Sequence, residues 1–158
     1  YVVAVRDRIL RDARDLQAIG VGVAAISAND VESYPDFLPW CLAVRVKERD
    51  QPHPSDGHTF IVADMVIGFK IFRERFTSKV ECQRPGRIDI NYTNGPFRYL
   101  NNHWVFTEVG KSSCEIDFFV DFEFRSIILQ KAIGIVFNEA VQKMVDAFEA
   151  RANILYPA

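Results

Sequence analysis

Cysteines are few in this chain, and their spacing does not indicate a disulfide framework or a zinc site. Cys41, Cys82 and Cys114 form an odd number at wide intervals, without a C-x-x-C pair. Small secreted domains usually carry an even set of cysteines, and structural zinc sites need closely spaced ligands. The sequence therefore predicts reduced thiols in an intracellular protein, with no bound metal.

The chain also lacks an excess of positive charge and any apolar run long enough to cross a bilayer. Lys and Arg number 19 against 21 Asp and Glu, which gives a formal net charge of -2. Because nucleic-acid-binding domains usually show a clustered basic excess, no DNA partner is expected. The longest apolar run, residues 18–28, is shorter than the roughly 20 residues of a transmembrane helix. Acidic residues precede this run, which is not typical of a signal peptide.

Motifs of catalysis and cofactor binding are missing or lack their context. No nucleophile elbow, P-loop or zinc motif occurs. Gly20, Gly22 and Ala25 fit the spacing G-x-G-x-x-A, but a charged, helix-like segment precedes them where a dinucleotide site requires a strand. The other polar candidates are interpreted as solvated or ordinary strand residues: His53, Asp56, His58 and His103. With no catalytic residue expected, the sequence favours a binding module over an enzyme.

Phenylalanine, in contrast, is abundant, with 13 residues. The stretch EIDFFVDFEF at 115–124 alternates, and strand side chains alternate between the two faces of a sheet. The acidic face carries Glu115, Asp117, Asp121 and Glu123, and the apolar face carries Ile116, Phe118, Val120, Phe122 and Phe124. We expect the acidic row to be solvated and to lie opposite a basic residue of a neighbouring strand, such as Arg73, Arg75 or Lys79. We expect the apolar row to line a core or a cavity.

Hydrophobic periodicity predicts a single α+β domain over residues 1–158. Three-to-four spacing indicates an amphipathic helix at 5–19 and a short helix at 30–37 that Pro39 ends. Two-residue alternation predicts about six antiparallel strands, at 41–50, 58–68, 75–83, 87–93, 103–109 and 112–124. Ser126 is a suitable N-cap for a long C-terminal helix, whose apolar stripe is Ile133, Phe137, Val141, Met144, Phe148, Ala152 and Leu155. A cavity is expected between this helix and the sheet.

Three stretches occur in order along the chain: VESYPDFLPWC at 31–41, NGPFRYLNNHWVF at 94–106 and VDFEFRSIILQKAIGIVFNEAVQKMVDAFEARA at 120–152. Together they resemble the Coq10 family, the ubiquinone-binding branch of the START-like, or polyketide cyclase-like, superfamily, which also contains the bacterial RatA proteins. Residues 1–28 diverge from the family pattern. The resemblance implies a helix-grip fold, in which a curved antiparallel sheet of about six to seven strands wraps around the C-terminal helix and leaves an apolar cavity.

The resemblance implies that the chain binds ubiquinone or a similar prenylquinone in this cavity and carries it in support of respiration, with no reaction and no cofactor of its own. The residues expected in the wall are Phe37, Leu38, Trp40, Phe69, Phe97, Trp104, Phe118, Phe122, Phe124, Phe137, Val141, Met144 and Phe148. Transient membrane contact is expected where apolar and basic side chains mix, at Phe69, Lys70, Phe72 and Arg73. The protein would act in the bacterial cytoplasm, peripheral to the inner membrane, or on the matrix side of the mitochondrial inner membrane.

Two alternatives remain open at this stage. The RatA branch implies association with the large ribosomal subunit and inhibition of translation, with the ribosome as partner. The polyketide cyclase branch implies an aromatase or cyclase enzyme. That enzyme would require an acid–base pair on the inward positions, and the sequence does not indicate one.

Overall fold

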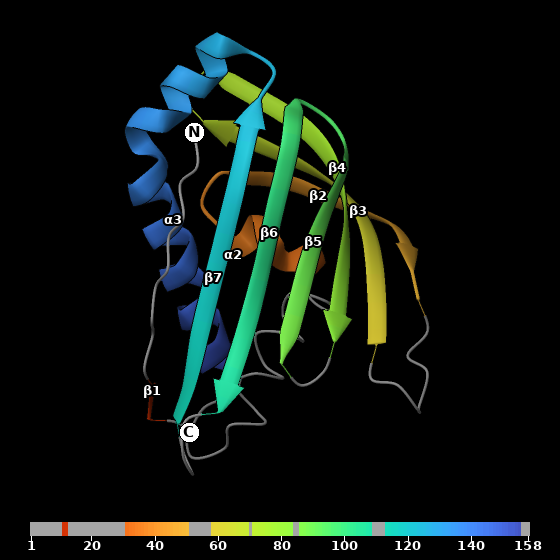
Figure 1. Cartoon of the computed structure of the whole chain (residues 1–158), viewed down its shortest axis with the longest axis vertical. Helices are drawn as coiled ribbons and strands as arrows, with labels where there is room; N and C mark the ends of the chain where they lie inside the picture. Colours follow the sequence, from red (N-terminus) through yellow and green to blue (C-terminus); the bar gives the residue numbers. More distant parts are fainter. Residues whose placement is uncertain are drawn as a thin grey trace.

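Six long strands form one curved antiparallel sheet, and a short seventh strand adds to its edge (Figure 1). The computed structural model describes residues 11–12, 31–50, 58–69, 71–83, 86–108 and 113–155. The strands are β1 (Arg11–Asp12), β2 (Cys41–Arg49), β3 (His58–Phe69), β4 (Phe72–Gln83), β5 (Arg87–Asn94), β6 (Phe97–Glu108) and β7 (Ser113–Phe124). Their spatial order is β1-β7-β6-β5-β4-β3-β2, so from β2 to β7 each strand pairs with the next one along the chain.

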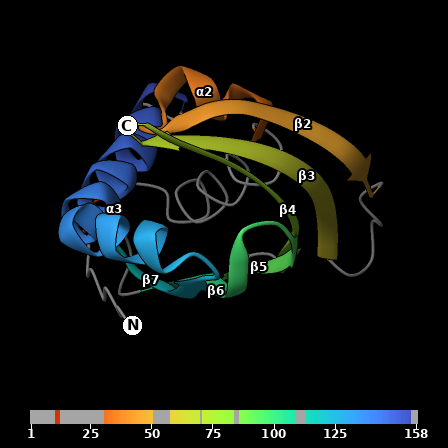
Figure 2. The ribbon, with the colours of Figure 1, turned by 90° about the horizontal axis from the view of Figure 1, so that it is seen from above.

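The sheet bends so strongly that β2 and β3 lie across the interior from β6 and β7 (Figure 2). Register shifts interrupt the β2–β3, β4–β5 and β6–β7 pairs, and such bulges bend and twist a strand. Gly95 turns the chain between β5 and β6 with a φ of 142°, and a Cβ there would lie 2.6 Å from the Cβ of Phe76. Glycine is therefore required where this turn presses on β4.

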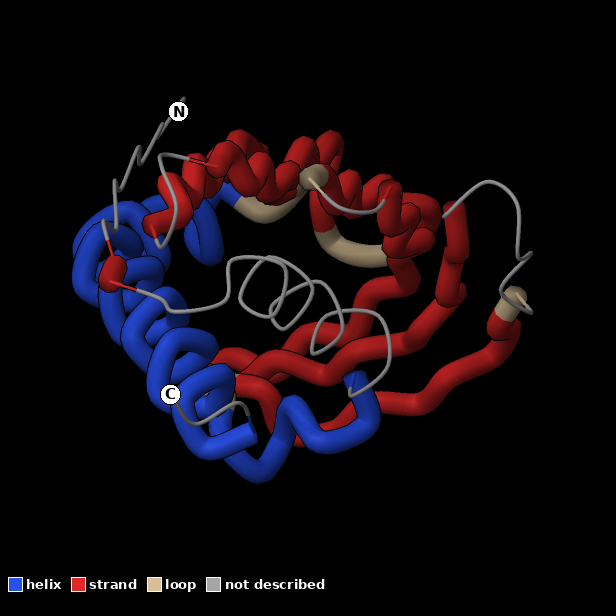
Figure 3. Tube along the Cα trace, turned by 90° about the horizontal axis from the view of Figure 1, so that it is seen from below, coloured by secondary structure: helices blue, strands red, loops and turns tan. Residues whose placement is uncertain are grey.

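Helix α3 (Ile127–Leu155) lies along the open side of the bent sheet (Figures 2 and 3). Its first turn is held by side chains, because the amide of Leu129 donates to Oγ of Ser126 over 3.3 Å. The side chain of Gln130 reaches back, and its Oε1 accepts a hydrogen bond of 2.8 Å from the amide of Phe124. These bonds fix the direction in which the helix leaves β7.

A second, much shorter helical segment precedes the sheet. It consists of a 3-10 helix η1 (Val31–Ser33) and one turn of α-helix α2 (Tyr34–Phe37). The amide of Leu38 donates to the carbonyl of Tyr34 over 2.8 Å and closes this turn. Tyr34 packs edge-on against Phe148 of α3, with ring centroids 5.4 Å apart. The short helix therefore anchors the C-terminal half of α3.

Alternation along β7 is confirmed, since Phe118, Val120, Phe122 and Phe124 are buried. A basic cross-strand partner is confirmed for one residue of its acidic row, but the residues named as examples are wrong. Arg98 on β6 pairs with Glu123 over 3.1 Å, and the hydroxyl of Tyr99 donates to Asp121 over 3.3 Å. Arg73, Arg75 and Lys79 lie on β4, which β5 and β6 separate from β7.

The helix predicted at 5–19 is wrong at Arg11 and Asp12, which form β1 and pair with Cys114 and Ser113 of β7. The edge of β7 presents backbone N–H and C=O groups that β6 does not pair, and an extended segment can pair with them. The rest of that segment, the G-x-G-x-x-A motif at 20–25 and the residues His53 and Asp56 all lie outside the described residues. Val31 to Phe37 are helical, within the predicted range of 30–37.

Candidate ligand cavity

A cavity of about 290 Å³ lies between the inner face of the sheet and α3. This volume is just below the range found for pockets that hold small molecules, about 300 to 1,000 Å³. Each strand from β2 to β7 contributes inward side chains, and α3 contributes Leu129, Ile133, Val136, Phe137, Ala140, Met144 and Phe148. Aliphatic and aromatic side chains form nearly all of the wall.

The structure brings most of the predicted site residues together around this cavity. Those that line it are Leu38, Trp40, Phe69, Phe97, Trp104, Phe118, Phe122, Phe124, Phe137, Met144 and Phe148. Phe37 instead lies at a shallow surface depression between α2 and α3, although its ring also touches Phe148. Val141 is on α3, and its side chain lies outside the described residues.

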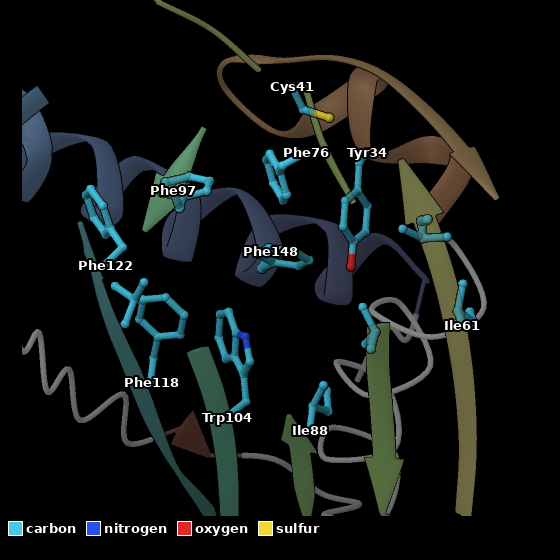
Figure 4. Packing of buried hydrophobic residues seen from close by; sticks show 14 of the residues in the cluster. Tyr34, Cys41, Ile61, Phe76, Ile88, Phe97, Trp104, Phe118, Phe122 and Phe148 are labelled. Carbon is cyan, nitrogen blue, oxygen red and sulfur yellow. The ribbon is translucent and has the colours of Figure 1, made fainter. Parts of the chain in front are cut away.

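Aromatic rings from the sheet and from α3 meet at one end of the cavity (Figure 4). Trp104 and Phe118 lie side by side on β6 and β7, with ring centroids 4.4 Å apart, and Phe148 of α3 meets Trp104 at 5.4 Å. All three side chains are buried. Their contacts join the sheet to the helix at this end.

The wall at the other end is built by the β3–β4 hairpin and the loop before β2. Phe69 and Phe72 pair across the hairpin and are only half-buried. Trp40 packs edge-on against Phe69 at 6.2 Å and has a φ of 64°, which is unfavourable for a residue with a Cβ. Its carbonyl accepts a hydrogen bond of 2.8 Å from the amide of Gly68, which holds the strained loop against the hairpin. We take this end as the mouth.

The structure also changes the expected membrane-contact surface. Phe69 and Phe72 line the cavity and do not project outward, whereas Ile71 between them is 91% exposed at the hairpin tip. Arg73 is exposed beside it, and Lys70 lies outside the described residues. Contact with a lipid surface at this tip stays a prediction.

Sequence reasoning missed the polar members of the wall, which are Glu74, Ser78 and Asn102. Glu74 was not among the residues expected in the wall. It is the only carboxylate among the described residues that line the cavity. Ser78 is buried in the middle of β4. Strand alternation extended to the hairpin tip would have placed Glu74 and Ser78 on the same face as Phe76.

Among the described residues, the ionisable groups near the cavity form no arrangement suited to nucleophilic or metal chemistry. Burial raises the pKa of the Cys41 thiol to about 11, so this residue of the wall stays protonated at neutral pH. His103 lies on the outer face, stacked on Phe119, and burial lowers its pKa, with the nearby Arg87 acting in the same direction. Within the described part of the chain, no group of three or more potential metal ligands occurs.

None of the described helices is both long and apolar enough to cross a membrane. The candidate site is an apolar pocket that reaches the β3–β4 hairpin at one end, with a few polar groups in its wall.

Comparison with known proteins gives a consistent family match. Residues 28–149 match the family described as polyketide cyclase / dehydrase and lipid transport. The chain is 33% identical over 128 residues to a ribosome association toxin RatA of Pseudomonas aeruginosa, covering 81% of this chain and 84% of that protein. It is 32% identical to the mitochondrial coenzyme Q-binding protein COQ10 of Drosophila melanogaster, covering 76% of this chain and 48% of that protein.

Solved structures show the same fold. An 18 kDa protein from Caulobacter crescentus is similar with a TM-score of 0.72 at 25% identity, with 99% of each chain covered. The Zhui aromatase/cyclase from Streptomyces is similar with a TM-score of 0.73 at 14% identity, over 97% of this chain and 94% of that one. A START superfamily protein from Mycobacterium smegmatis gives a TM-score of 0.71 at 15% identity, over 96% and 98% of the two chains.

Proposed function

The chain belongs to the polyketide cyclase / dehydrase and lipid transport family, and we propose that it binds ubiquinone or a similar prenylquinone in its cavity and carries it without transforming it. The apolar wall of the cavity is the observation that carries this proposal. The similarity to a coenzyme Q-binding protein supports the choice of ligand.

The wall provides what a flexible apolar ligand needs. Aromatic rings such as Phe122 and Phe137, with centroids 4.8 Å apart, supply large contact areas, and the flexible Met144 adapts to irregular shapes. Burying one CH₂ group stabilises a complex by about 0.8 kcal/mol, so each five-carbon isoprene unit contributes on the order of 3 to 4 kcal/mol relative to water. A few units are therefore sufficient for tight binding.

The size of the cavity limits how much of the ligand it can enclose. Its volume of about 290 Å³ suits a quinone ring and the beginning of a tail. The rest of a polyprenyl tail would leave through the mouth beside Phe69 and Phe72. Since lipid tails are as apolar as the cavity wall, transfer of the tail between bilayer and protein is close to balanced. Reversible exchange of this kind suits a carrier at the surface of a respiratory membrane.

A role without catalysis is supported by the chemistry of the wall. The Cys41 thiol is protonated, and Glu74 has no second carboxylate or histidine beside it among the described residues of the wall. General acid–base chemistry on a polyketide would need such a pair. We therefore favour a carrier over a cyclase, although cyclases share the fold.

The direct test is mass spectrometry of lipids extracted from the protein after expression in a ubiquinone-producing bacterium. We expect a prenylquinone at close to one molecule per chain, and the same ligand should be taken up from vesicles by protein stripped of lipid. A native preparation that carries no prenylquinone and that takes none up from vesicles would contradict the proposal.

Association with ribosomes is a second candidate, because the relatives at 33 to 36% identity include RatA proteins named for it. Sedimentation with the large ribosomal subunit at moderate salt would support this function. If the protein does not sediment with the subunit but takes up quinone, the carrier function is supported and ribosome association is contradicted. If both activities are found, filling the cavity by Ala63→Phe would show whether ribosome binding needs the ligand.

A further inference from the structure

We propose that the first turns of α3 and the tip of the β3–β4 hairpin together form a docking surface for a bilayer that contains anionic lipids. The docking surface rests on the proposed function and adds to it the face through which the ligand is exchanged. Two kinds of side chain, exposed isoleucines and exposed basic residues, gather there at one end of the molecule.

Three connections lie together at the upper end of the molecule in Figure 1, and Figure 2 looks onto this end. They are the β3–β4 hairpin, the turn between β5 and β6, and the junction that leads from β7 into α3. We call this surface the rim, and it consists of residues 71–76, 94–98 and 123–135.

Hydrogen bonds tie the start of α3 to the β5–β6 turn. The amide of Arg125 donates to the carbonyl of Pro96 over 2.9 Å, and its Nε donates to the carbonyl of Phe97 over 3.1 Å. The hairpin and α3 both contribute to the cavity wall, through Phe69 and Leu129 among others. The hairpin and the first turns of α3 therefore border the same end of the cavity.

Exposed isoleucines are concentrated at the rim. Six large apolar side chains are exposed among the described residues, and four of them belong to the rim. Ile71 stands at the hairpin tip, and Ile127 and Ile128 are in the first turn of α3. Ile135 follows Ile128 by seven residues, which places both on the same face of the helix. Single apolar side chains are normal on a surface, whereas a cluster of them marks a site of interaction.

The charge of the rim is mainly positive. It contains five basic side chains and two acidic ones, although the whole chain has a net charge of -2. Of the two acidic residues, Glu74 lines the cavity and Glu123 is paired with Arg98. The other basic residues of the rim are all exposed, and they are Arg73, Arg75, Arg125 and Lys131. A surface with this excess of positive charge attracts anionic lipid headgroups.

The charges at the start of α3 are not those that stabilise a helix. The partial positive charge of a helix N-terminus favours acidic residues in the first turn. The first turn of α3 contains none, and Arg125 and Lys131 add positive charge on either side of it. Acidic residues occur in this helix only from Glu139 onward. A partner of opposite charge explains an arrangement that the helix itself does not need.

The mixture of side chains at the rim decides between the possible partners. Phosphate groups of a nucleic acid would pair with the basic residues, but they would leave the isoleucines in water. A bilayer offers anionic headgroups and, just below them, acyl chains that accept isoleucine side chains. Docking in this orientation places Phe69 and Phe72, at the end that we take as the mouth, against the lipid. A prenyl tail then passes between bilayer and cavity without crossing water.

Flotation with vesicles tests the docking surface directly. We would compare vesicles of phosphatidylcholine alone with vesicles that also contain phosphatidylglycerol. The protein should bind the anionic vesicles about tenfold or more tightly than the neutral ones, because several basic residues face the lipid. Added salt should weaken binding to the anionic vesicles, since it screens exposed charges.

Substitutions at the rim have matched controls on the same helix. Ile71→Asn and Ile128→Asn should each weaken binding to anionic vesicles about tenfold, since each removes an apolar side chain from the lipid. Ile154→Asn should leave binding unchanged, because Ile154 is 71% exposed against 72% for Ile128 but lies at the far end of α3. Lys131→Gln should weaken binding about fivefold, whereas Lys143→Gln, further along α3, should not.

A second measurement separates docking from ligand binding. Trp40 and Trp104 are the two tryptophans of the chain and both line the cavity, so their fluorescence reports a short-tailed ubiquinone analogue added in water. Ile128→Asn should bind this analogue as the unchanged protein does. The same variant should take up a long-tailed quinone from anionic vesicles more slowly.

Equal binding of the unchanged protein to neutral and anionic vesicles, or anionic binding that neither Ile71→Asn nor Ile128→Asn weakens, would overturn the docking surface. Binding of the analogue would then leave the carrier function intact. Vesicle binding by a protein that takes up no quinone would overturn the carrier function alone. If Ile128→Asn abolishes sedimentation with ribosomes, or converts a dimer to a monomer, while vesicle binding is unchanged, the isoleucines belong to another interface and the docking proposal is wrong.

Discussion

Replacing Ala63 with phenylalanine is expected to abolish prenylquinone uptake while the protein stays folded. Ala63 lies on β3, is 2% exposed and lines the cavity. A benzyl group at this position extends into a space of about 290 Å³ and takes the place of ligand atoms. Excluding only four ligand carbons would remove about 3 kcal/mol of binding free energy, which corresponds to a loss of affinity of more than 100-fold. Uptake from vesicles, followed by quinone absorbance, measures the effect.

Val62→Phe is the control for this experiment. Val62 is the neighbouring residue on the same strand and is paired with Lys79 on the outer surface of the sheet, so a phenylalanine at this position stands outside the cavity. We expect normal uptake by Val62→Phe and thermal midpoints of both variants near that of the unchanged protein. Undiminished uptake by a folded Ala63→Phe protein would show that the ligand binds elsewhere.

Truncating Phe118 to alanine is expected to destabilise the fold by about 3 to 5 kcal/mol, the range measured for buried phenylalanines. Its side chain is 2% exposed, and its ring lies 4.4 Å from that of Trp104. In a domain of this size each kcal/mol lowers the thermal midpoint by about 2 to 4 °C, so a fall on the order of 10 °C should appear in a calorimetric scan.

The adjacent Phe119 provides a control of the same residue type. Its side chain points to the opposite face, where it stacks on His103 with ring centroids 4.9 Å apart and remains partly exposed. Phe119→Ala should cost about 1 kcal/mol, the range found for aromatic pairs beyond their buried area. Similar losses for the two substitutions would contradict the assignment of inner and outer faces along β7.

The inner face of β7 and the start of α3 could be predicted from the sequence because both depend on local pattern. The alternation in EIDFFVDFEF separates Phe118 from Phe119 without any knowledge of neighbouring strands. The start of α3 is local in the same sense, because the hydroxyl of Ser126 caps backbone amides only a few residues further along the chain. Both features follow from the geometry of a single segment.

Features that depend on strand order could not be predicted in this way. The acidic residues of β7 pair with Arg98 and Tyr99 because β6 lies beside β7, and nothing in the β7 segment specifies that neighbour. The inward position of Glu74 depends in a similar way on how two strands are joined. The β3–β4 hairpin turns between Phe69 and Phe72 without the Gly or Asn that usually marks a tight turn, so alternation was not carried through to the tip.

Asn102 illustrates a third limit of sequence reasoning. It follows another asparagine, Asn101, and two adjacent polar residues give no indication of which one faces inward. Only the register with Ile90 and Val120 resolves this point. Asn102 is therefore the kind of wall residue that a hydrophobic pattern cannot reveal.

The outer strand β2 has a consequence for the behaviour of the protein at high concentration. It forms one edge of the sheet and carries three exposed basic side chains, Arg45, Lys47 and Arg49. Two register shifts also interrupt its pairing with β3. Charged side chains and bulges both hinder the addition of a strand from another molecule. This edge of the sheet is in this way protected from edge-to-edge aggregation.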